Sequence, residues 1–529
     1  MGGATALTPV PRLSKSRFLA GLQCHKLLWW QVHEPHAPEL KPSPDLEARF
    51  AAGKLVGDAA RGYVPGGELI GFRHFEVERK LDATQTALAR TTAPLYEAAF
   101  ATDRAYAVLD ILERGRRPDT FTLIEVKSST DVKPEHIPDV GLQAYVARAS
   151  GIAVERVEVM HLNRACRYPD LTNLFTRKDV TPQVEGFVPG VADEIARQHA
   201  DLAGPLPDVP IGDHCFTPYE CPFMKRCWPQ WPDDHVSTLY IMRRRALELE
   251  AQGYHTLHDL PGDLKLSAIQ ARQVRAVQAG ALVVEDSLTE ALAPFERPLA
   301  FLDFETVSPA IPVWNGCRPW DKVPVQFSVH VQHPTAKGGY EHHQWLFDGP
   351  AGTDPRPEQA ERLVAACAGA EAIVAYNSSF ERDCIRLLAD GVPGLARELG
   401  MIELKLVDLL PVVRNHVYHP KFGGSFSLKN VLPALVPDLS YEDLPIHDGA
   451  TATLVLWRLL LERDYYAPRE RERQRRALLA YCERDSWATV KLLERLRALA
   501  GLAPTAPPFP PAAEVARQKA RAVQLDFGF

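Results

Sequence analysis

The period of the hydrophobic and polar pattern changes along the chain and divides it into four segments. Residues 10–233 mix strand-like alternation with helical stretches and end in the run Cys227-Trp228-Pro229-Gln230-Trp231-Pro232, where a helix cannot continue. Residues 234–297 place aliphatic residues at helical spacing among arginines and glutamates, which predicts a helical connector. From residue 298 to 500 strands alternate with helices, and residues 501–529 form a Pro-rich tail.

The composition is that of a globular protein with more than one core. A chain of 529 residues, 46% hydrophobic and 24% charged, is expected to form two large α/β domains joined by the connector. Residues 23–26, Gln-Cys-His-Lys, interrupt any apolar run of signal-peptide or membrane-span length near the start, so we expect a cytoplasmic protein without a membrane partner. The net charge of -7 means that nucleic-acid binding would depend on local basic grooves and on metal held by acidic clusters.

Two adjacent predicted strands carry an acidic pair and a lysine. They cover residues 106–114 and 121–127, with a turn between them. The alternation puts Glu125 and Lys127 on one face, and Asp110 lies on the neighbouring strand. Two carboxylates can hold a hard divalent cation while the ammonium group sits beside the attacking water or the phosphate. The alternative is a solvated strand face with a cross-strand ion pair.

A predicted helix over residues 136–149 brings Gln143 towards the same strand ends. The order Asp110, Glu125-x-Lys127, Gln143 resembles the PD-(D/E)XK nucleases of the RecB, AddB and CRISPR-adaptation group. The resemblance implies a restriction-endonuclease-like fold for the first segment, with Asp110 and Glu125 as metal ligands.

One position departs from that group of nucleases. They often have a histidine in an early helix after a glycine, whereas the matching stretch here, residues 53–58, has Gly57 at that place. Glu97, in a predicted strand, is the candidate for a replacement ligand.

Four of the nine cysteines are spaced like metal ligands. Without a secretion signal the thiols are expected to stay reduced and available for metal, and Cys215, Cys221 and Cys227 follow one another with five residues between them. Together with Cys24 they resemble the iron-sulfur site of AddB-like and CRISPR-adaptation nucleases, which implies a [4Fe-4S] cluster with a structural role. Zinc is the alternative, although structural zinc sites favour gaps of two to four residues.

A second acidic group begins at the strand near residue 300. Asp303 and Glu305 point the same way from its end, because one residue separates them. Glu381 lies in the first turn of a predicted helix, and Tyr481 and Asp485 share one face of another helix. Four carboxylates repel each other unless divalent cations compensate them, and two ions about 4 Å apart stabilise phosphoryl transfer.

The order DxE, NxxF(D/E), YxxxD of these motifs resembles the DEDD 3'-5' exonucleases of the tyrosine subtype. It implies an RNase H-like fold for residues 298–500, two Mg²⁺ or Mn²⁺ ions on the four carboxylates, and a Tyr481 that orients or helps deprotonate water. Glu381 stands where aspartate is usual, and its longer side chain can reach a metal through water. Without the resemblance, the motifs would be a chance strand end and a surface helix face.

Three further features are candidates for supporting roles. Asp408 matches another acidic position common in the DEDD superfamily, with a helix cap as an equal alternative. The loop over residues 425–430 is expected near the second acidic group, where it could contact substrate phosphate. The terminal residues 524–529 loosely resemble a bacterial sliding-clamp peptide, which implies a clamp as an additional partner.

Taken as a whole, the chain resembles a bacterial family of fusions between these two nuclease domains. We expect Mg²⁺- or Mn²⁺-dependent hydrolysis of DNA with single-stranded ends as substrate, because both groups process strands from an end, and RNA is the nearest alternative. A different class of function is a nucleic-acid-binding or redox-sensing module in which one carboxylate site has decayed. Gly57 and Glu381 motivate that alternative.

Overall fold

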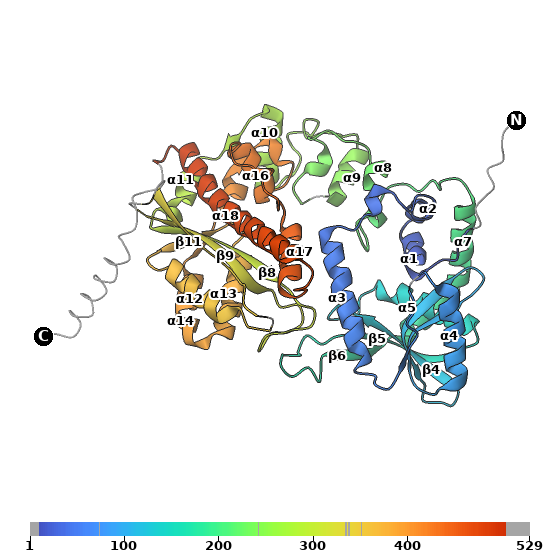
Figure 1. Ribbon diagram of the computed structural model, residues 1–529. Helices are drawn as coiled ribbons and strands as arrows, with labels where there is room; N and C mark the ends of the chain where they lie inside the picture. Colours follow the sequence, from blue (N-terminus) through green and yellow to red (C-terminus); the bar gives the residue numbers. More distant parts are fainter. Residues whose placement is uncertain are drawn as a thin grey trace. The chain divides into compact units, whose positions relative to one another are not determined.

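The chain forms two compact units, each combining α-helices with β-strands (Figure 1). The first unit comprises Met1–Gln230 and Pro309–Asp321, and the second comprises Trp231–Ser308 and Lys322–Phe529. The computed structural model describes, within these ranges, residues 10–73, 75–241, 243–333, 336, 339–350 and 352–503. The clamp-like peptide over residues 524–529, and all of the predicted tail after residue 503, lie outside the described residues. Both units confirm the expected α/β class.

A six-stranded mixed sheet in the order β1-β2-β3-β4-β5-β6 forms the centre of the first unit. Its strands are β1 (Glu68–Leu69), β2 (Leu95–Ala101), β3 (Tyr106–Arg114), β4 (Thr120–Lys127), β5 (Ala153–Leu162) and β6 (Phe175–Asp179). The β1–β2 and β4–β5 pairs are parallel and the others antiparallel. The strand predicted over residues 106–114 is confirmed, and the one predicted over 121–127 begins one residue earlier.

Helices cover both faces of this sheet. They are α1 (Lys15–Gln23), α2 (His25–His33), α3 (Pro44–Arg61), α4 (Val77–Arg90), α5 (His136–Ala149), α6 (Thr181–Phe187), α7 (Val191–Ala203) and α8 (Met224–Cys227). Leu123 of β4 packs into one cluster with Leu142 of α5, whereas its neighbour Ile124 packs with Ala60 of α3. Because successive strand residues face opposite sides, α5 and α3 lie on opposite faces. The helix predicted over residues 136–149 is confirmed.

The second unit contains a five-stranded mixed sheet in the order β10-β9-β8-β11-β12. Its strands are β8 (Leu299–Val307), β9 (Val323–Gln332), β10 (Tyr340–Leu346), β11 (Ala372–Ala375) and β12 (Leu406–Asp408). The strands β10, β9 and β8 pair antiparallel, and β8, β11 and β12 pair parallel. A separate two-stranded sheet joins β7 (Val283–Val284) to β13 (Val417–Tyr418).

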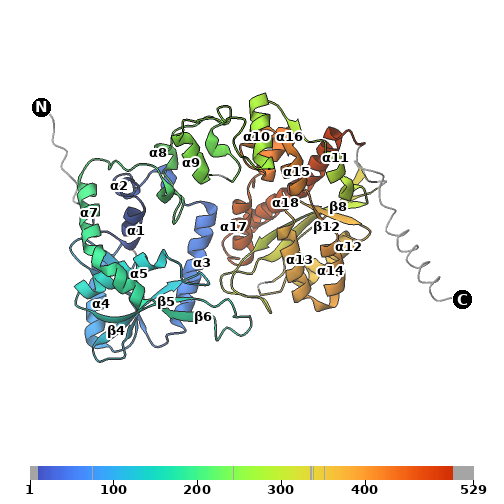
Figure 2. The same ribbon diagram turned by 180° about the vertical axis from the view of Figure 1, so that it is seen from behind.

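Helices pack on both faces of the five-stranded sheet, with α18 crossing one face while α12 and α13 cover the other (Figure 2). The helices of this unit are α9 (Arg243–Ala251), α10 (Ala268–Ala279), α11 (Leu288–Ala291), α12 (Arg356–Ala366), α13 (Ser379–Gly391), α14 (Ala396–Leu404), α15 (Leu410–His416), α16 (Leu428–Leu435), α17 (Gly449–Leu460) and α18 (Pro468–Leu499). Over the described ranges, none of the helices has the length and apolar character that a membrane crossing requires.

The predicted connector over residues 234–297 is helical in part, through α9, α10 and α11, but it is not a free linker. Val236, Leu257 and Phe295 are buried in one cluster with Phe301 of β8. The apolar residues that suggested helices are therefore part of the core of the second unit. The boundary predicted at residue 233 lies close to Gln230, where the first stretch of the first unit ends.

The segment Pro309–Asp321 departs from the predicted domain order. It follows β8 in the chain but groups with the first unit. The Trp320 indole Nε1 donates to the Ser128 carbonyl oxygen at 2.6 Å, and Ala310 is buried in a cluster with Val56. The segment contains neither helix nor strand, so its sequence has no periodic pattern from which its packing partner could be predicted.

Candidate active sites

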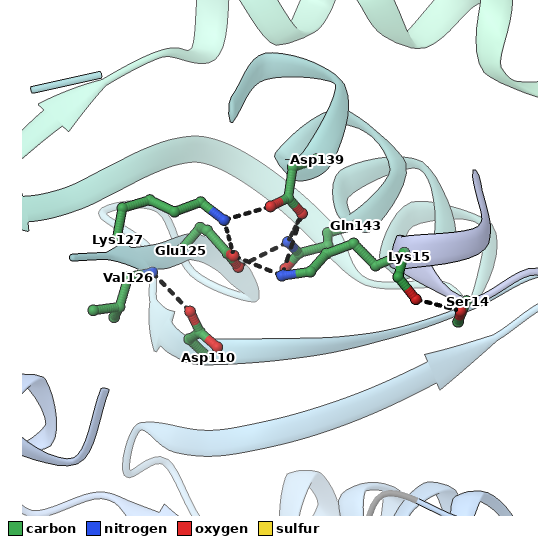
Figure 3. Close-up of polar contacts among 9 residues, drawn as sticks. Ser14, Lys15, Asp110, Glu125, Val126, Lys127, Asp139 and Gln143 are labelled. Carbon is green, nitrogen blue, oxygen red and sulfur yellow. Dashed lines mark hydrogen bonds and ion pairs between the residues drawn. The ribbon is translucent and has the colours of Figure 1, made fainter. Parts of the chain in front are cut away.

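In the first unit, strands β3 and β4 separate next to the predicted acidic pair. Their ladder pairs Ile111 with Ile124, and beyond this point the Val126 backbone N–H donates to Asp110 Oδ2 at 2.7 Å (Figure 3). The Asp110 side chain thus takes the place of a ladder acceptor. This contact holds the two predicted carboxylates, Asp110 in the middle of β3 and Glu125 near the end of β4, where the pairing of these strands stops.

The other predicted residues of the first centre gather around Glu125, which is 1% exposed. Lys127 Nζ donates to Glu125 Oε1 at 2.7 Å, as the strand alternation predicted. The Gln143 amide donates to Glu125 Oε2 at 2.8 Å from the buried face of α5. All four residues predicted for this centre therefore come together.

Two residues of this centre were not foreseen. Lys15, at the start of α1, donates to Glu125 Oε1 at 2.7 Å and lies 3.3 Å from Asp139 Oδ1. Asp139 also accepts from Lys127 Nζ, and from the Gln143 amide at 3.0 Å. The i, i+4 spacing of Asp139 and Gln143 on α5 was a usable signal. Lys15 gave none, because it lies far from the motif in the chain.

Charge in the first centre is unevenly compensated. Burial, reinforced by the charge of Glu125, raises the pKa of Asp110 to about 7. Burial would also raise the pKa of Glu125, but the charges of Lys127 and Lys15 outweigh it and lower that pKa. Gln143 Oε1 is buried without a hydrogen-bond partner. The oxygen-rich donor set fits a divalent cation, which would compete with both ammonium groups for Glu125 Oε1.

Glu97, the candidate replacement ligand, is otherwise engaged. Its carboxylate lies 3.4 Å from an Arg61 guanidinium nitrogen and 3.5 Å from Lys80 Nζ. The Glu97 backbone has a φ of 60°, a strained conformation for a residue with a side chain. Among the described residues, its ion pairs are with these two cations and not with the first centre. Gly57 lies on α3 with open space where a side chain would project.

The four predicted cysteine ligands converge in the first unit. Cys24 lies between α1 and α2, and all four cysteines line one cavity together with Trp30 and Trp228. None forms a disulfide. Burial raises the pKa of Cys221 to about 11, and negative charge on the other three cysteine thiolates adds to this rise. Such mutual repulsion between thiolates is relieved when a metal group binds them.

The spacing of the thiols bears on which metal group fits. No three of the four described cysteine sulfur atoms lie within 4.8 Å of one another. A single zinc ion with Zn–S bonds of roughly 2.3 Å would hold its sulfur atoms about 3.8 Å apart. The four thiols are therefore not arranged as a single zinc ion would hold them.

In the second unit, three predicted carboxylates lie together. Asp303 and Glu305 extend from β8 and Asp485 from α18, and each offers an oxygen within 4.8 Å of the others. Burial and then the charge of Asp485 raise the pKa values of Asp303 and Glu305 well above their ordinary range. Burial raises the pKa of Asp485 to about 6, although hydrogen bonds from Tyr441 and Tyr481 act in the opposite direction.

Glu381 completes the predicted acidic set from the first turn of α13. It is 4% exposed, burial raises its pKa to about 8, and its charge contributes to the raised pKa of Asp303. Its Oε2 atom is buried without a hydrogen-bond partner. Burying a carboxylate oxygen without a partner is costly, and a cation bound at this oxygen would offset the cost. Glu381 nevertheless lies outside the trio of Asp303, Glu305 and Asp485, whose ligand atoms are all within 4.8 Å of one another.

Three side chains around these carboxylates were not singled out from the sequence. Tyr441 donates a short hydrogen bond to Asp485 Oδ1, and the Cys482 thiol donates to Asp303 Oδ2 at 3.1 Å. The pKa values of Glu305 and Asp485 are raised by burial, and the positive charge of Lys429, on α16, opposes part of this rise. Lys429 belongs to the loop segment expected near this centre, whereas Tyr441 lies in an irregular stretch without a motif.

Asp408 has a structural role, although it is not the helix cap that was weighed as its alternative, since the N-cap residues of α13 and α15 are Ser378 and Leu409. Its carboxylate accepts from the backbone N–H groups of Asn377 at 3.0 Å, Ser378 at 3.1 Å and Leu410 at 2.9 Å. The residue therefore ties the loop before α13 to the start of α15. It supports Glu381 indirectly, by fixing the loop that leads into the helix on which Glu381 lies.

Comparison with known families bears on part of the second unit. Residues 300–427 match a family described as "Domain of unknown function (DUF2779)". The matched stretch includes Asp303, Glu305 and Glu381 and ends before Tyr481 and Asp485. Comparison with curated proteins found no match. Residues 300–427 are thus similar to a family whose description assigns no activity.

Proposed function

We propose that the second unit is a divalent-metal-dependent nuclease of the DEDD type, which hydrolyses phosphodiester bonds of DNA from single-stranded ends. The observation that carries the proposal is the convergence of Asp303, Glu305 and Asp485 within 4.8 Å of one another. Four carboxyl groups with raised pKa values, one buried and three partly buried, gain most from Mg²⁺ or Mn²⁺, which prefer oxygen ligands. The expected placement at element ends holds only for Glu381, in the first turn of α13, since Asp303 lies in the middle of β8 and Asp485 in the middle of α18. A mixed sheet with helices on its faces agrees with the RNase H-like resemblance.

The residues around the carboxylates have separable roles in this reaction. Bound divalent ions would polarise the phosphate and supply an activated water. Tyr481, 4% exposed and on the same helix as Asp485, orients that water. Tyr441 and Cys482 are positioning residues, because each donates a hydrogen bond to one carboxylate and fixes its rotamer. The ammonium group of Lys429 is placed to attract the anionic backbone.

For the first unit, we propose a second hydrolytic centre of the RecB-like PD-(D/E)XK type. Asp110 and Glu125 would hold the cation, and Lys127 would contact the scissile phosphate. The support is the raised pKa of Asp110 and the hydrogen bonds that fix Lys127 and Gln143 against Glu125. The four cysteines would hold a [4Fe-4S] cluster that closes the chain around this centre, and their wide spacing favours that cluster over zinc.

One observation favours a decayed first centre as the alternative. Lys15 and Lys127 together already neutralise Glu125 and Asp139, so the centre is held together without a divalent ion. A buried network that is satisfied by its own cations can persist as a structural element of a nucleic-acid-binding module. The two proposals for this unit differ in one measurable property, which is whether Mn²⁺ binds at Asp110.

Activity assays with paired substitutions test both centres. Wild type, Asp110→Asn/Lys127→Met and Asp303→Asn/Asp485→Asn are compared on labelled single- and double-stranded DNA and RNA, with and without Mn²⁺. Asp383→Asn is the matched control, because this exposed aspartate lies on α13 two residues after Glu381. We expect the second pair to abolish exonuclease activity and the control to retain it. Full activity in Asp303→Asn/Asp485→Asn would show that the proposed second centre is wrong.

The same set of variants decides between the two proposals for the first unit. Loss of a separate activity in Asp110→Asn/Lys127→Met supports a hydrolytic centre, and an unchanged product pattern supports the decayed alternative. Purification without oxygen tests the cysteine site. A brown protein with iron and sulfide indicates the cluster, and a colourless protein containing zinc contradicts it.

A further inference from the structure

A group of nitrogen and oxygen ligands lies in the second unit apart from the acidic centre. His330 of β9 and His342 of β10 form a directly opposed cross-strand pair, with ring centroids 4.4 Å apart. Glu483 reaches the same place from α18, and its Oε1 lies 3.6 Å from His342 Nδ1. One ligand atom from each of the three residues falls within 4.8 Å of the others. This proximity is the first requirement for a shared metal ion.

Two buried hydroxyl groups fix the histidine rings. Ser486 Oγ lies 3.1 Å from the Glu483 carbonyl oxygen, to which it can donate, and 2.7 Å from Ser328 Oγ. We assign the imidazole N–H groups to His342 Nε2, 2.9 Å from Ser328 Oγ, and His330 Nδ1, 2.9 Å from Ser486 Oγ. Each imidazole then keeps an unprotonated nitrogen, His342 Nδ1 and His330 Nε2. Metal-binding histidines are commonly fixed in this way by a hydrogen bond from the second ring nitrogen.

The rings are held in the neutral form that binds metals. Burial lowers the pKa of His330 to about 3, and burial also lowers the pKa of His342. The three residues line a cavity of about 400 Å³ whose wall includes Tyr340 and Trp487. The Glu483 side chain is 48% exposed, so an ion can reach the group from solvent. The cavity leaves room for water or a small anion as a further ligand.

We propose that His330, His342 and Glu483 bind a divalent transition-metal ion, with Zn²⁺ as the preferred metal. Two imidazoles and one carboxylate are a zinc donor set, and such sites keep one coordination position open. Imidazole ligands suit Zn²⁺, Cu²⁺ or Ni²⁺, whereas Mg²⁺ prefers an all-oxygen set. The second unit would then hold two kinds of metal, oxygen-bound Mg²⁺ or Mn²⁺ at Asp303 and zinc at this site.

The consequence is a link between the sheet edge and the helix of the nuclease centre. Tyr481 and Asp485 flank Glu483 on α18, and the zinc ion would fasten this helix to β9 and β10. Binding to the folded state alone raises the free energy of unfolding by mass action. The site is therefore a stabilising clamp on α18, and its existence does not depend on the proposed nuclease activity.

Cobalt binding to the full-length protein tests the site. The protein is purified without oxygen, so that the cysteine site keeps its metal group, and loosely bound ions are removed with a mild chelator. It is then saturated with Mg²⁺ to fill the acidic centre and titrated with Co²⁺, and the visible bands of nitrogen and oxygen coordination are read as the difference from the Co²⁺-free protein. We expect about one Co²⁺ per chain with these bands, displaced by Zn²⁺. His342→Asn should lose the bands. His343→Asn is the matched control, because the neighbouring ring faces away from the site, towards Glu341.

Further variants separate the outcomes. Glu483→Gln changes an exposed side chain and should lose the bands without affecting folding. Zn²⁺ should raise the melting temperature of wild type and of His343→Asn, but not that of His342→Asn or Glu483→Gln. Ser328→Ala keeps all three ligands and should weaken binding about 10- to 100-fold. The bands should persist in Asp303→Asn/Asp485→Asn, which separates this site from the nuclease centre. Unchanged bands in His342→Asn and Glu483→Gln would overturn the proposal.

Discussion

At the scale of single residues, the carboxyl groups of the second centre share one physical condition. Each is partly or fully withdrawn from water near other acidic groups, so its protonated form is favoured in the folded chain. Burial is the main cause of the raised pKa of Glu381, whereas the pKa of Asp303 is raised by burial and also by the charges of Asp485 and Glu305. The centre therefore binds protons where it lacks a metal, and metal binding must displace them.

This condition predicts how stability depends on pH without divalent metal. The folded-state pKa values of Asp485, about 6, and Glu381, about 8, lie above the ordinary carboxyl values of about 4. The folded state then holds protons that the unfolded state has released. Its extra stability is fully present below about pH 4 and is lost as pH rises through the folded values to about 8. Thermal unfolding at a series of pH values measures this loss.

Two comparisons sharpen the prediction for pH. Mg²⁺ should raise the melting temperature more at pH 8 than at pH 6, because the ionised carboxylates bind it. Glu381→Gln removes one titrating group and should flatten the pH dependence, whereas Asp383→Asn should leave it unchanged. An identical pH profile in Glu381→Gln would contradict the assignment of the buried acid.

At the first centre, we expect substitution of Lys15 to lower the stability of the fold and to raise the affinity for Mn²⁺. Lys15→Met removes one cation from the buried carboxylates Glu125 and Asp139, and we expect a loss of about 2 kcal/mol in the free energy of unfolding. The same change removes a competitor for Glu125 Oε1, so Mn²⁺ should bind more tightly. Urea unfolding and calorimetric Mn²⁺ titration measure the two effects.

The control for Lys15 is a nearby exposed ion pair. Arg12 contacts Glu78, whose side chain is 75% exposed, so Arg12→Met should cost less than about 1 kcal/mol. Equal losses in Lys15→Met and Arg12→Met would mean that the buried network contributes nothing of its own.

At the scale of elements, the turn before α16 sets the place of Lys429. Gly424 has a φ of 77°, and its backbone N–H donates to the Tyr418 hydroxyl group at 2.9 Å. A Cβ atom at this position would lie 1.9 Å from the Thr238 carbonyl oxygen. The turn therefore needs glycine for two reasons, a left-handed backbone and a close approach of another backbone segment.

Gly424→Ala is accordingly expected to destabilise the second unit by roughly 2 kcal/mol or more, since both strain and steric overlap must be relieved. Denaturant unfolding followed by hydrogen exchange in α16 measures the effect. Gly394→Ala is the control, because nothing lies within 4 Å of its added Cβ. Equal stability of the two variants would show that the turn adapts, and Lys429 would then be less firmly placed than proposed.

At the scale of the whole molecule, chain order and unit membership differ. The segment Pro309–Asp321 begins two residues after β8 ends, yet it belongs to the first unit. Trp320 is fixed there by its bond to the Ser128 carbonyl oxygen, next to the catalytic candidate Lys127. A substitution in the C-terminal half of the sequence should therefore change the stability of the N-terminal unit.

Trp320→Ala tests this assignment. We expect it to destabilise the first unit by about 1 to 3 kcal/mol, because the indole is only partly buried and also loses a hydrogen bond. Hydrogen exchange should show lost protection in β4 and unchanged protection in β11. Trp320→Phe keeps a ring without the N–H group and should cost less. Lost protection confined to the second unit would contradict the grouping.

The sequence by itself determined the elements and motifs that depend on neighbouring residues. Period-two alternation predicted β3 and β4, and one-residue spacing put Asp303 and Glu305 on the same side of β8. The expected convergence of the four cysteines agrees with the cavity they line. Such features are readable because side-chain direction repeats with the local backbone geometry.

Only the tertiary structure decided which distant side chains meet. Lys15 beside Glu125, Tyr441 beside Asp485 and the pairing of His330 with His342 depend on strand register and helix packing. The place of Pro309–Asp321 and the burial of the predicted connector were decided in the same way. No short pattern encodes these contacts, because their free energy comes from burial shared among segments that are far apart in the chain.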